Sequence, residues 1–82
     1  MKDKQVLAKL EEIVGQLGID LRWDEGEFTG GICRLGERKI LVINRSLPTF
    51  VKIEVLCREL SRTDLSTIFI LPAIREQISR FH

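Results

Sequence analysis

The sequence is poor in the residues that metal and nucleophilic chemistry require. It has one histidine, His82, and two cysteines, Cys33 and Cys57, which are too far apart to form a Cys-x-x-Cys pair. Two such cysteines make neither a disulfide framework nor a zinc knuckle, and a nucleophilic thiol needs a histidine or a helix N-terminus beside it. We therefore expect no cofactor, no metal site and no catalytic residue, and we predict that the protein is not an enzyme.

Long hydrophobic runs are also missing. The longest uninterrupted apolar runs are residues 40–43 and 68–71, whereas a helix that spans a bilayer needs about 20 apolar residues. The charged first residues contain no apolar signal-peptide core. The sequence predicts no membrane contact and a cytoplasmic location, where free thiols stay reduced.

Neither sign of charge dominates the chain. The formal net charge is +1, whereas nucleic-acid-binding domains are usually strongly basic. Residues 1–30 carry four basic and seven acidic side chains, and residues 31–82 carry nine basic and five acidic ones. The second half is mildly basic, so nucleic acid or another polyanion is the alternative partner to a protein.

The length and composition favour one small globular domain over residues 1–82. A chain of 82 residues is near the lower limit for one independent hydrophobic core. Its 44% hydrophobic and 30% charged residues are ordinary values for a folded protein. We expect a single domain with no linker or repeat.

Apolar residues three or four positions apart predict a first helix. This set comprises Val6, Leu7, Leu10, Ile13, Val14 and Leu17. Such a spacing places its members on one helical face. Gly18 is positioned to end the helix in the left-handed conformation, with Ile19 folding back on Val14.

Three strands are predicted next, over residues 19–24, 28–35 and 39–44. Gly30 and Gly31 interrupt the second strand, where glycine often marks a bulge or a close backbone approach. Gly36 and Glu37 then close a hairpin. The third strand holds Ile-Leu-Val-Ile at residues 40–43, a pattern typical of a strand buried on both faces. We place it at the centre of the sheet or under the helices.

The last third of the chain predicts two more helices. Pro48 fits the first turn of a helix that continues to about Thr63. Residues 65–71 are ambiguous between a short strand and an extended connection. Pro72 opens a final helix, with Ala73, Ile74, Ile78 and Phe81 expected to face inward. The predicted fold is therefore α+β, ordered helix, three-stranded antiparallel meander, helix, short extended segment, helix, with the helices covering one face of the sheet.

The junction between the third strand and the second helix carries a family resemblance. Residues 40–48 read Ile-Leu-Val-Ile-Asn-Arg-Ser-Leu-Pro, and residues 55–62 read Val-Leu-Cys-Arg-Glu-Leu-Ser-Arg. Together, over about residues 38–64, they resemble minimal zincin metallopeptidases of the ImmA/IrrE type. That family uses a His-Glu-x-x-His motif on a helix, with two histidines as zinc ligands and the glutamate as general base.

The zinc motif of that family is lost in this sequence. Arg58 and Arg62 stand at the two histidine positions, and Glu59 stands at the position of the general base. Guanidinium groups do not bind a metal cation, so Glu59 has no metal-bound water to deprotonate. The resemblance therefore implies a scaffold of helix, antiparallel strands and former active-site helix, without protease activity.

Charged residues of the second half admit two interpretations. Glu54 with Arg58, and Glu59 with Arg62, have the spacing of weak ion pairs on a solvated helix face. Alternatively, these residues contribute to a binding patch together with the basic residues near the strands, including Lys39. The candidate binding residues are Arg34, Arg38, Arg45, Arg58, Glu59 and Arg62.

The remaining candidates are predicted to pack rather than bind. Cys33 lies in a strand and Cys57 on the apolar stripe of a helix, where a free cysteine behaves as a small buried hydrophobe. Trp23, at the end of a strand, is expected to pack on the first helix, although an indole there can also anchor a protein contact. If the second face of the sheet is not covered, its apolar area favours a homodimer or another protein partner. A small interaction module is thus the predicted function.

Overall fold

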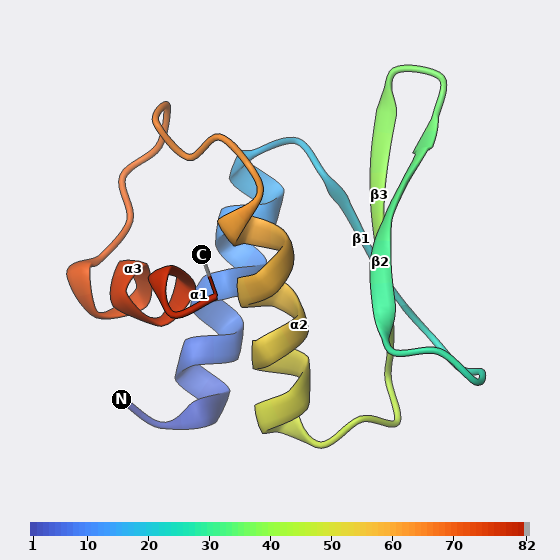
Figure 1. Cartoon of the computed structure of the whole chain (residues 1–82), viewed down its shortest axis with the longest axis horizontal. Coiled ribbons are helices and arrows are strands. Elements are labelled where there is room, and N and C mark those ends of the chain that lie inside the picture. Colours follow the sequence, from blue (N-terminus) through green and yellow to red (C-terminus); the bar gives the residue numbers. More distant parts are fainter. Residues whose placement is uncertain (82) are drawn as a thin grey trace.

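In the computed structural model, which describes residues 1–81, two helices pack on one face of a three-stranded sheet and a third helix packs on these two helices (Figure 1). The elements, in chain order, are α1 (Asp3–Gln16), β1 (Asp20–Asp24), β2 (Gly30–Leu35), β3 (Arg38–Asn44), α2 (Thr49–Ser61) and α3 (Pro72–Ser79). The predicted α+β class and the order of helices and strands are confirmed.

The predicted antiparallel meander is wrong. The strand order is β1-β3-β2, and β1 pairs with β3 in parallel, with Asp20 beside Ile40 and Asp24 beside Asn44. Only β2 and β3 form the expected antiparallel hairpin, with Gly30 beside Ile43 and Leu35 beside Arg38. The sheet is therefore mixed, and β3 lies at its centre, which is one of the two positions that the sequence left open for it.

The composition of the strands explains this order. β3 contributes Ile40, Leu41 and Ile43 to the buried residues, whereas none of the residues of β2 is buried. A central strand has neighbours on both sides and is the better place for side chains that are apolar on both faces. A meander would place the glycine-containing β2 at the centre and leave β3 at an edge, which buries less apolar surface.

The C-terminus of α1 follows the prediction. Gly18 has a φ of 74°, a left-handed conformation that glycine adopts without steric cost. The Gly18 N–H donates to the Gly15 carbonyl oxygen at 3.0 Å, and the Ile19 N–H donates to that of Val14 at 3.2 Å. These two bonds form a Schellman motif, which ends the helix and directs the chain into β1.

The last third of the chain differs from the prediction in detail. Pro48 is the N-cap of α2 rather than part of its first turn, and α2 ends at Ser61. Residues 65–71 form turns and an extended connection without a strand. Ala73 is exposed, whereas Ile74 and Ile78 of α3 are buried, because an eight-residue helix presents only one narrow face to the core.

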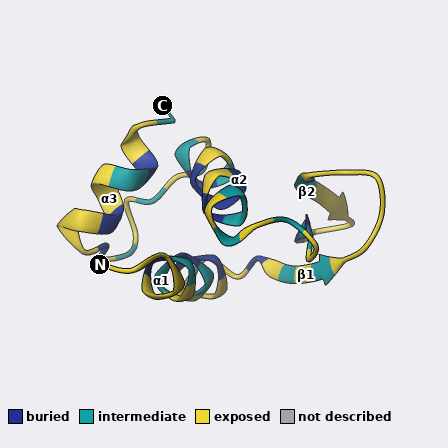
Figure 2. Ribbon diagram, turned by 90° about the horizontal axis from the view of Figure 1, so that it is seen from below, coloured by how far each residue is buried: buried dark blue, intermediate teal, exposed yellow. Residues whose placement is uncertain are grey.

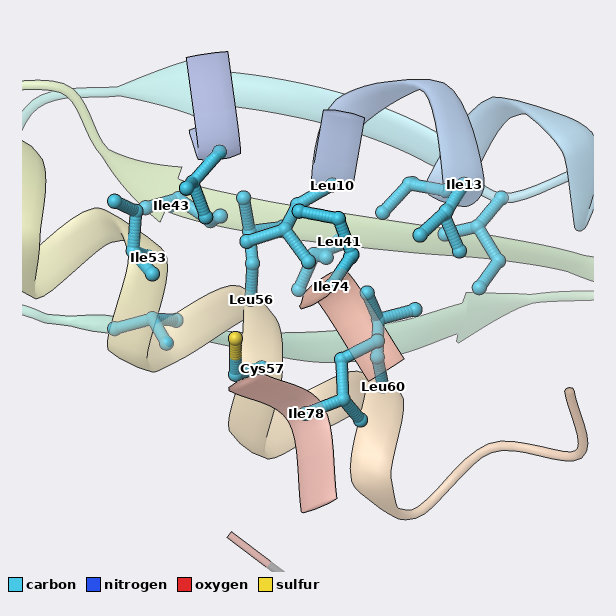
Figure 3. Close-up of a cluster of buried hydrophobic side chains, with 14 of the residues drawn as sticks. Leu10, Ile13, Leu41, Ile43, Ile53, Leu56, Cys57, Leu60, Ile74 and Ile78 are labelled. Atoms are coloured by element: carbon cyan, nitrogen blue, oxygen red, sulfur yellow. The ribbon is translucent and has the colours of Figure 1, made fainter. Parts of the chain in front are cut away.

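The core lies between the sheet and the helices (Figure 3). Its fully buried side chains come from α1, β3, α2 and α3, and include Leu10, Leu41, Ile43, Leu56, Leu60 and Ile74. α1 and α2 contact each other and the sheet, whereas α3 contacts only these two helices. One side of the sheet is thus occupied by the helical layer.

The two cysteines have different environments. Cys57 of α2 is fully buried as predicted, but Cys33 of β2 is exposed, because its side chain points to the sheet face opposite the helices. Burial raises the pKa of the Cys57 thiol from 9.0 to about 11, although the charge of Arg80 lowers it slightly. A thiol buried in this way favours its neutral form.

This pKa shift predicts a loss of stability in alkali. The unfolded chain releases the Cys57 proton near pH 9 and the folded chain near pH 11. The contribution of Cys57 is therefore constant below pH 9, and the free energy of unfolding falls by roughly 2 kcal/mol as the pH rises to 11. Urea unfolding across this range, compared with Cys57→Val, isolates the effect. An identical decline in both proteins would contradict it.

Candidate functional site on the uncovered side of the sheet

The strand register divides the sheet into two faces. Leu21 and Trp23 of β1 lie beside Leu41 and Ile43 of β3, and all four belong to or pack against the core. The alternate positions point the other way. They form a second surface, the open face, which comprises Asp20, Arg22, Asp24, Gly31, Cys33, Leu35, Arg38, Ile40, Val42 and Asn44.

No helix among residues 1–81 covers the open face (Figures 1 and 2). Its charged residues lie mainly on β1, and its apolar residues on β2 and β3. Leu35 is 62% exposed, Val42 is half-buried, and Ile40 is buried outside the main core cluster. The open face therefore has an apolar half around Leu35, Cys33 and Val42, next to a charged half along β1.

An ion pair borders this apolar half. The Arg38 guanidinium donates a hydrogen bond to the carboxylate of Asp20 across the sheet. Both side chains are exposed, so the pair adds little to stability. The guanidinium of Arg38 is therefore already paired with Asp20 of the same chain.

Gly30 and Gly31 differ in what surrounds them. A Cβ atom at Gly30 would lie 2.8 Å from the Val42 carbonyl oxygen and 3.0 Å from a methyl group of Val55. Gly30 is thus the close backbone approach that the sequence predicts, and the unbroken register rules out a bulge at this position. A Cβ atom at Gly31, on the open face, would meet nothing within 4 Å. The fold itself gives no reason for glycine at residue 31.

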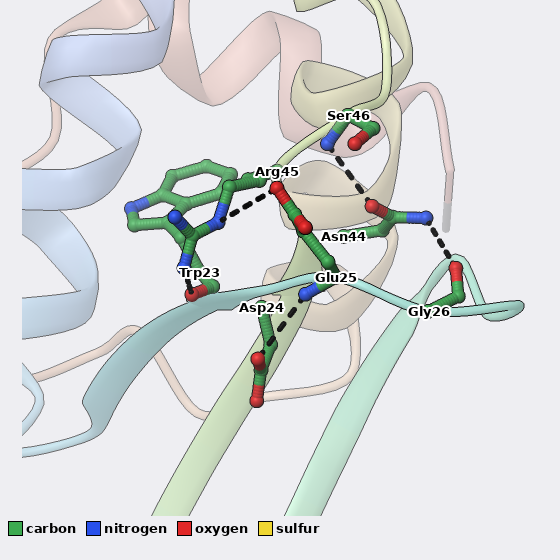
Figure 4. A network of polar contacts seen from close by, with 7 residues as sticks. All are labelled: Trp23, Asp24, Glu25, Gly26, Asn44, Arg45 and Ser46. Carbon is green, nitrogen blue, oxygen red and sulfur yellow. Dashed lines mark hydrogen bonds and ion pairs between the residues drawn. The ribbon is translucent and has the colours of Figure 1, made fainter.

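Asn44, the last residue of β3, holds the connection between β1 and β2 by hydrogen bonds (Figure 4). Its side-chain amide donates to the carbonyl oxygens of Gly26 and Phe28 at 2.9 and 3.0 Å, and its side-chain oxygen accepts from the Ser46 N–H at 3.0 Å. The connection from β1 to β2 has to pass the end of β3, and these bonds hold it there. The sequence places Asn44 in the family resemblance, but only the strand order assigns it this structural role.

Arg45 and Trp23 lie beside Asn44 and also have structural contacts (Figure 4). Arg45 donates to the Trp23 carbonyl oxygen at 3.0 Å, and its guanidinium lies 4.0 Å from the Glu25 carboxylate. The Trp23 ring is half-buried against the core, and the Lys52 ammonium of α2 lies 5.2 Å from its centroid. Trp23 therefore packs against the core, and its cation contact is with α2 and not with the first helix, on which the sequence predicted it to pack.

The outer edge of β2 is unpaired among residues 1–81. The Asn44 N–H donates to the Thr29 carbonyl oxygen at 3.0 Å, and hydrogen-bonded pairs alternate along an antiparallel ladder. Gly31, Cys33 and Leu35 therefore direct their backbone groups to β3. The N–H and C=O groups of Gly30, Ile32 and Arg34 point away from the sheet.

α2 runs beside β2 with its C-terminal end toward the β2–β3 turn (Figure 1). Val55 of α2 is next to Gly30. Glu59 and Arg62 follow Val55 at spacings of four and seven, so they share this side of the helix. Arg58 and Arg62 are exposed, and Glu59 is half-buried. The predicted ion pairs of Glu54 with Arg58 and of Glu59 with Arg62 are absent from residues 1–81, and Arg58 instead lies 5.9 Å from the Phe81 ring centroid.

The six candidate binding residues thus do not form one patch. Arg38 and Arg45 are at opposite ends of β3, and each bonds within its own chain. Arg34 lies on β2 itself, Glu59 and Arg62 lie on the side of α2 that Val55 turns to Gly30, and Arg58 lies against the Phe81 ring. The sequence could not separate these positions, because the separation depends on strand register and on which side of α2 faces β2.

The hollows of the surface lie elsewhere. One of about 250 Å³ is formed by α1 and the segment before α3, next to the exposed Phe69, and another of about 300 Å³ lies between Phe50 and Phe81. Within residues 1–81, no three potential metal ligands come together, and no helix has the length and apolarity to cross a membrane.

The fold and site define a small α+β domain with a mixed sheet that is covered on one face only. No protein-family model, curated protein or solved structure matches this chain.

Proposed function

We propose that the protein is a non-catalytic interaction module of the cytoplasm, which binds a protein partner through the uncovered side of its sheet. The observation that carries this proposal is the apolar half of the open face. Leu35, Cys33 and Val42 are accessible there without a covering element among residues 1–81. Exposed apolar surface next to charged residues is typical of protein contacts.

Gly31 gives a second reason to propose the open face as the binding surface. Glycine within a strand costs stability because it adds no packing and loses more conformational entropy than other residues. Since a side chain at Gly31 would be free of contacts inside the chain, a close approach by another molecule gives this glycine a reason. The exposed thiol of Cys33 fits a reducing compartment.

The resemblance of residues 38–64 to minimal zincin peptidases remains a proposal about origin. Its support is the sequence pattern from β3 to α2, in which Arg58 and Arg62 replace the two histidines. Two guanidinium groups repel a cation. This substitution favours a binding role over a hydrolytic one.

Nucleic-acid binding, the alternative, has less support. Arg38 and Arg45 are at opposite ends of β3 and are paired with Asp20 and Glu25. A phosphate backbone is usually bound by several free basic groups along one surface. We therefore propose a protein partner rather than a polyanion for this domain.

Photo-crosslinking inside the native cells tests the proposal. p-Benzoylphenylalanine replaces Leu35 on the open face in one variant and Glu12 in the matched control. The Glu12 side chain is 62% exposed on α1. We expect a discrete cross-linked protein from position 35 and none from position 12. Equal cross-linking from both positions, or none from position 35, would contradict the proposed function.

A further inference from the structure

We propose that the free edge of β2 binds an extended acidic segment of a partner protein, which adds to the sheet as a fourth strand beside β2. This inference rests on the proposed function and names the chemistry of the partner. It is carried by the backbone groups at the edge, by the difference between the two edges of the sheet, and by the charges that flank β2.

The backbone of β2 offers a regular set of binding groups. The N–H and C=O groups of Gly30, Ile32 and Arg34 point outward, as the bond between Asn44 and Thr29 establishes. An extended segment satisfies such groups by main-chain hydrogen bonds, the binding mode called β-augmentation. β2 contains no proline and no bulge that would block this pairing.

The other edge of the sheet is less suited to pairing. β1 carries Asp20, Arg22 and Asp24 at alternate exposed positions. Charged side chains along an edge strand are a common protection against pairing with another chain. β2 has a single charged residue, Arg34. The edge formed by β2 is therefore the less protected of the two edges.

The charges beside β2 select an acidic segment. Arg34 lies directly opposite Lys39, in a pair that is not hydrogen-bonded and whose side chains are therefore close. Like charges in this position destabilise a sheet, and within residues 1–81 neither side chain forms an ion pair. Arg62 at the end of α2 is exposed, and it follows Val55, the neighbour of Gly30, by seven residues, so it lies on the same side of the helix. Carboxylates on an added strand would relieve this repulsion.

The same charges disfavour a second copy of this chain as the occupant. Two β2 edges related by a two-fold axis would bring the Arg34 and Arg62 groups of both copies to one interface. Like charges across an interface suppress association. The partner segment is therefore expected on a different protein.

Selection from a phage-displayed library of short random peptides on the purified domain tests the inference. We expect the selected peptides to be rich in Asp and Glu alternating with β-branched residues. The affinity of a selected peptide is then measured for three proteins: the natural chain, Arg34→Pro and Arg34→Thr. Both variants lose the same charge, but only proline removes the outward N–H.

We expect Arg34→Thr, which removes only the charge, to weaken binding about fivefold. Arg34→Pro, which also removes the N–H, is expected to weaken binding at least about tenfold more than Arg34→Thr. If Arg34→Pro does not fold, methylation of alternate amide nitrogens in the peptide replaces it and is expected to abolish binding. Basic or helical peptides, no enriched peptide, self-association of the domain, or equal affinities for the two variants would overturn the inference. None of these results would affect cross-linking from position 35. The proposed function is therefore tested separately, by the cross-linking experiment.

Discussion

Gly30→Val is expected to lower the free energy of unfolding by about 3 kcal/mol, since the new side chain has no room. The first added carbon would lie 2.8 Å from the Val42 carbonyl oxygen, 3.0 Å from a methyl group of Val55 and 3.3 Å from the Cα atom of Ile43. Two of these three neighbours are backbone atoms at the centre of the sheet, which do not move independently of the strand. Urea unfolding monitored by circular dichroism measures the loss.

Gly31→Val provides the matched control for this prediction. It makes the same substitution at the adjacent residue of the same strand, where an added Cβ atom meets nothing within 4 Å. Because valine has a higher β-propensity than glycine, we expect Gly31→Val to stabilise the fold by about 0.5 kcal/mol. Equal destabilisation by both substitutions would show that loss of strand flexibility, and not the contact with Val42 and Val55, is the cause.

Leu56→Ala is expected to have an effect of similar size at the centre of the core. Leu56 of α2 is fully buried, and it lies beside Leu10, Leu41 and Ile74 in the layer between helices and sheet (Figure 3). Truncation leaves a cavity and removes the transfer free energy of the lost methyl groups, which together cost about 3 kcal/mol. In a domain of this size, the midpoint of thermal unfolding should fall by roughly 15 °C.

Glu54→Ala, two positions earlier on the same helix, is the control for Leu56→Ala. Glu54 is exposed and forms no ion pair within residues 1–81. The free energy of unfolding of the Glu54→Ala variant is expected to stay within about 0.5 kcal/mol of that of the natural protein. A large loss from Glu54→Ala would indicate that α2 depends on its surface charges, and the burial of Leu56 alone would then not account for the stability of the helix.

Local patterns predicted most of the secondary structure. Apolar residues at helical spacing located α1, and Gly18 marked its end. Gly36 marked the β2–β3 turn, where it takes a φ of 64°. Each of these features depends on residues that are neighbours in sequence, so one chain is sufficient to predict them.

Strand order could not be predicted from local patterns in this chain. Consecutive strands usually pair, which favoured a meander. The structure instead places β3 between β1 and β2, because Ile40, Leu41 and Ile43 need cover on both sides. This preference depends on the burial of apolar surface in the whole sheet. The sequence of the β1–β2 connection, residues 25–29, does not indicate it.

The same limit applied to the candidate site. The sequence grouped Arg34, Arg58 and Arg62 with Arg38 and Arg45, but the structure places Arg38 and Arg45 at opposite ends of β3 in contacts of their own. Cys33 was assigned to the core because the register that turns it outward depends on strand pairing. The importance of Gly31 is visible only when the space around its Cα atom is known.

The position of β3 between β1 and β2 also sets an order for folding. β2 and β3 meet through a two-residue turn, so Leu35 and Arg38 pair after closing a very short loop. Asp20 and Ile40 are twenty residues apart, so the pairing of β1 with β3 has to close a much longer loop. Since short loops close faster and at lower entropic cost, the hairpin should form first and β1 should dock last, with α1 attached. During synthesis and refolding, β3 therefore passes through a stage with one side unpaired, and chaperones or high dilution should raise the yield of folded protein.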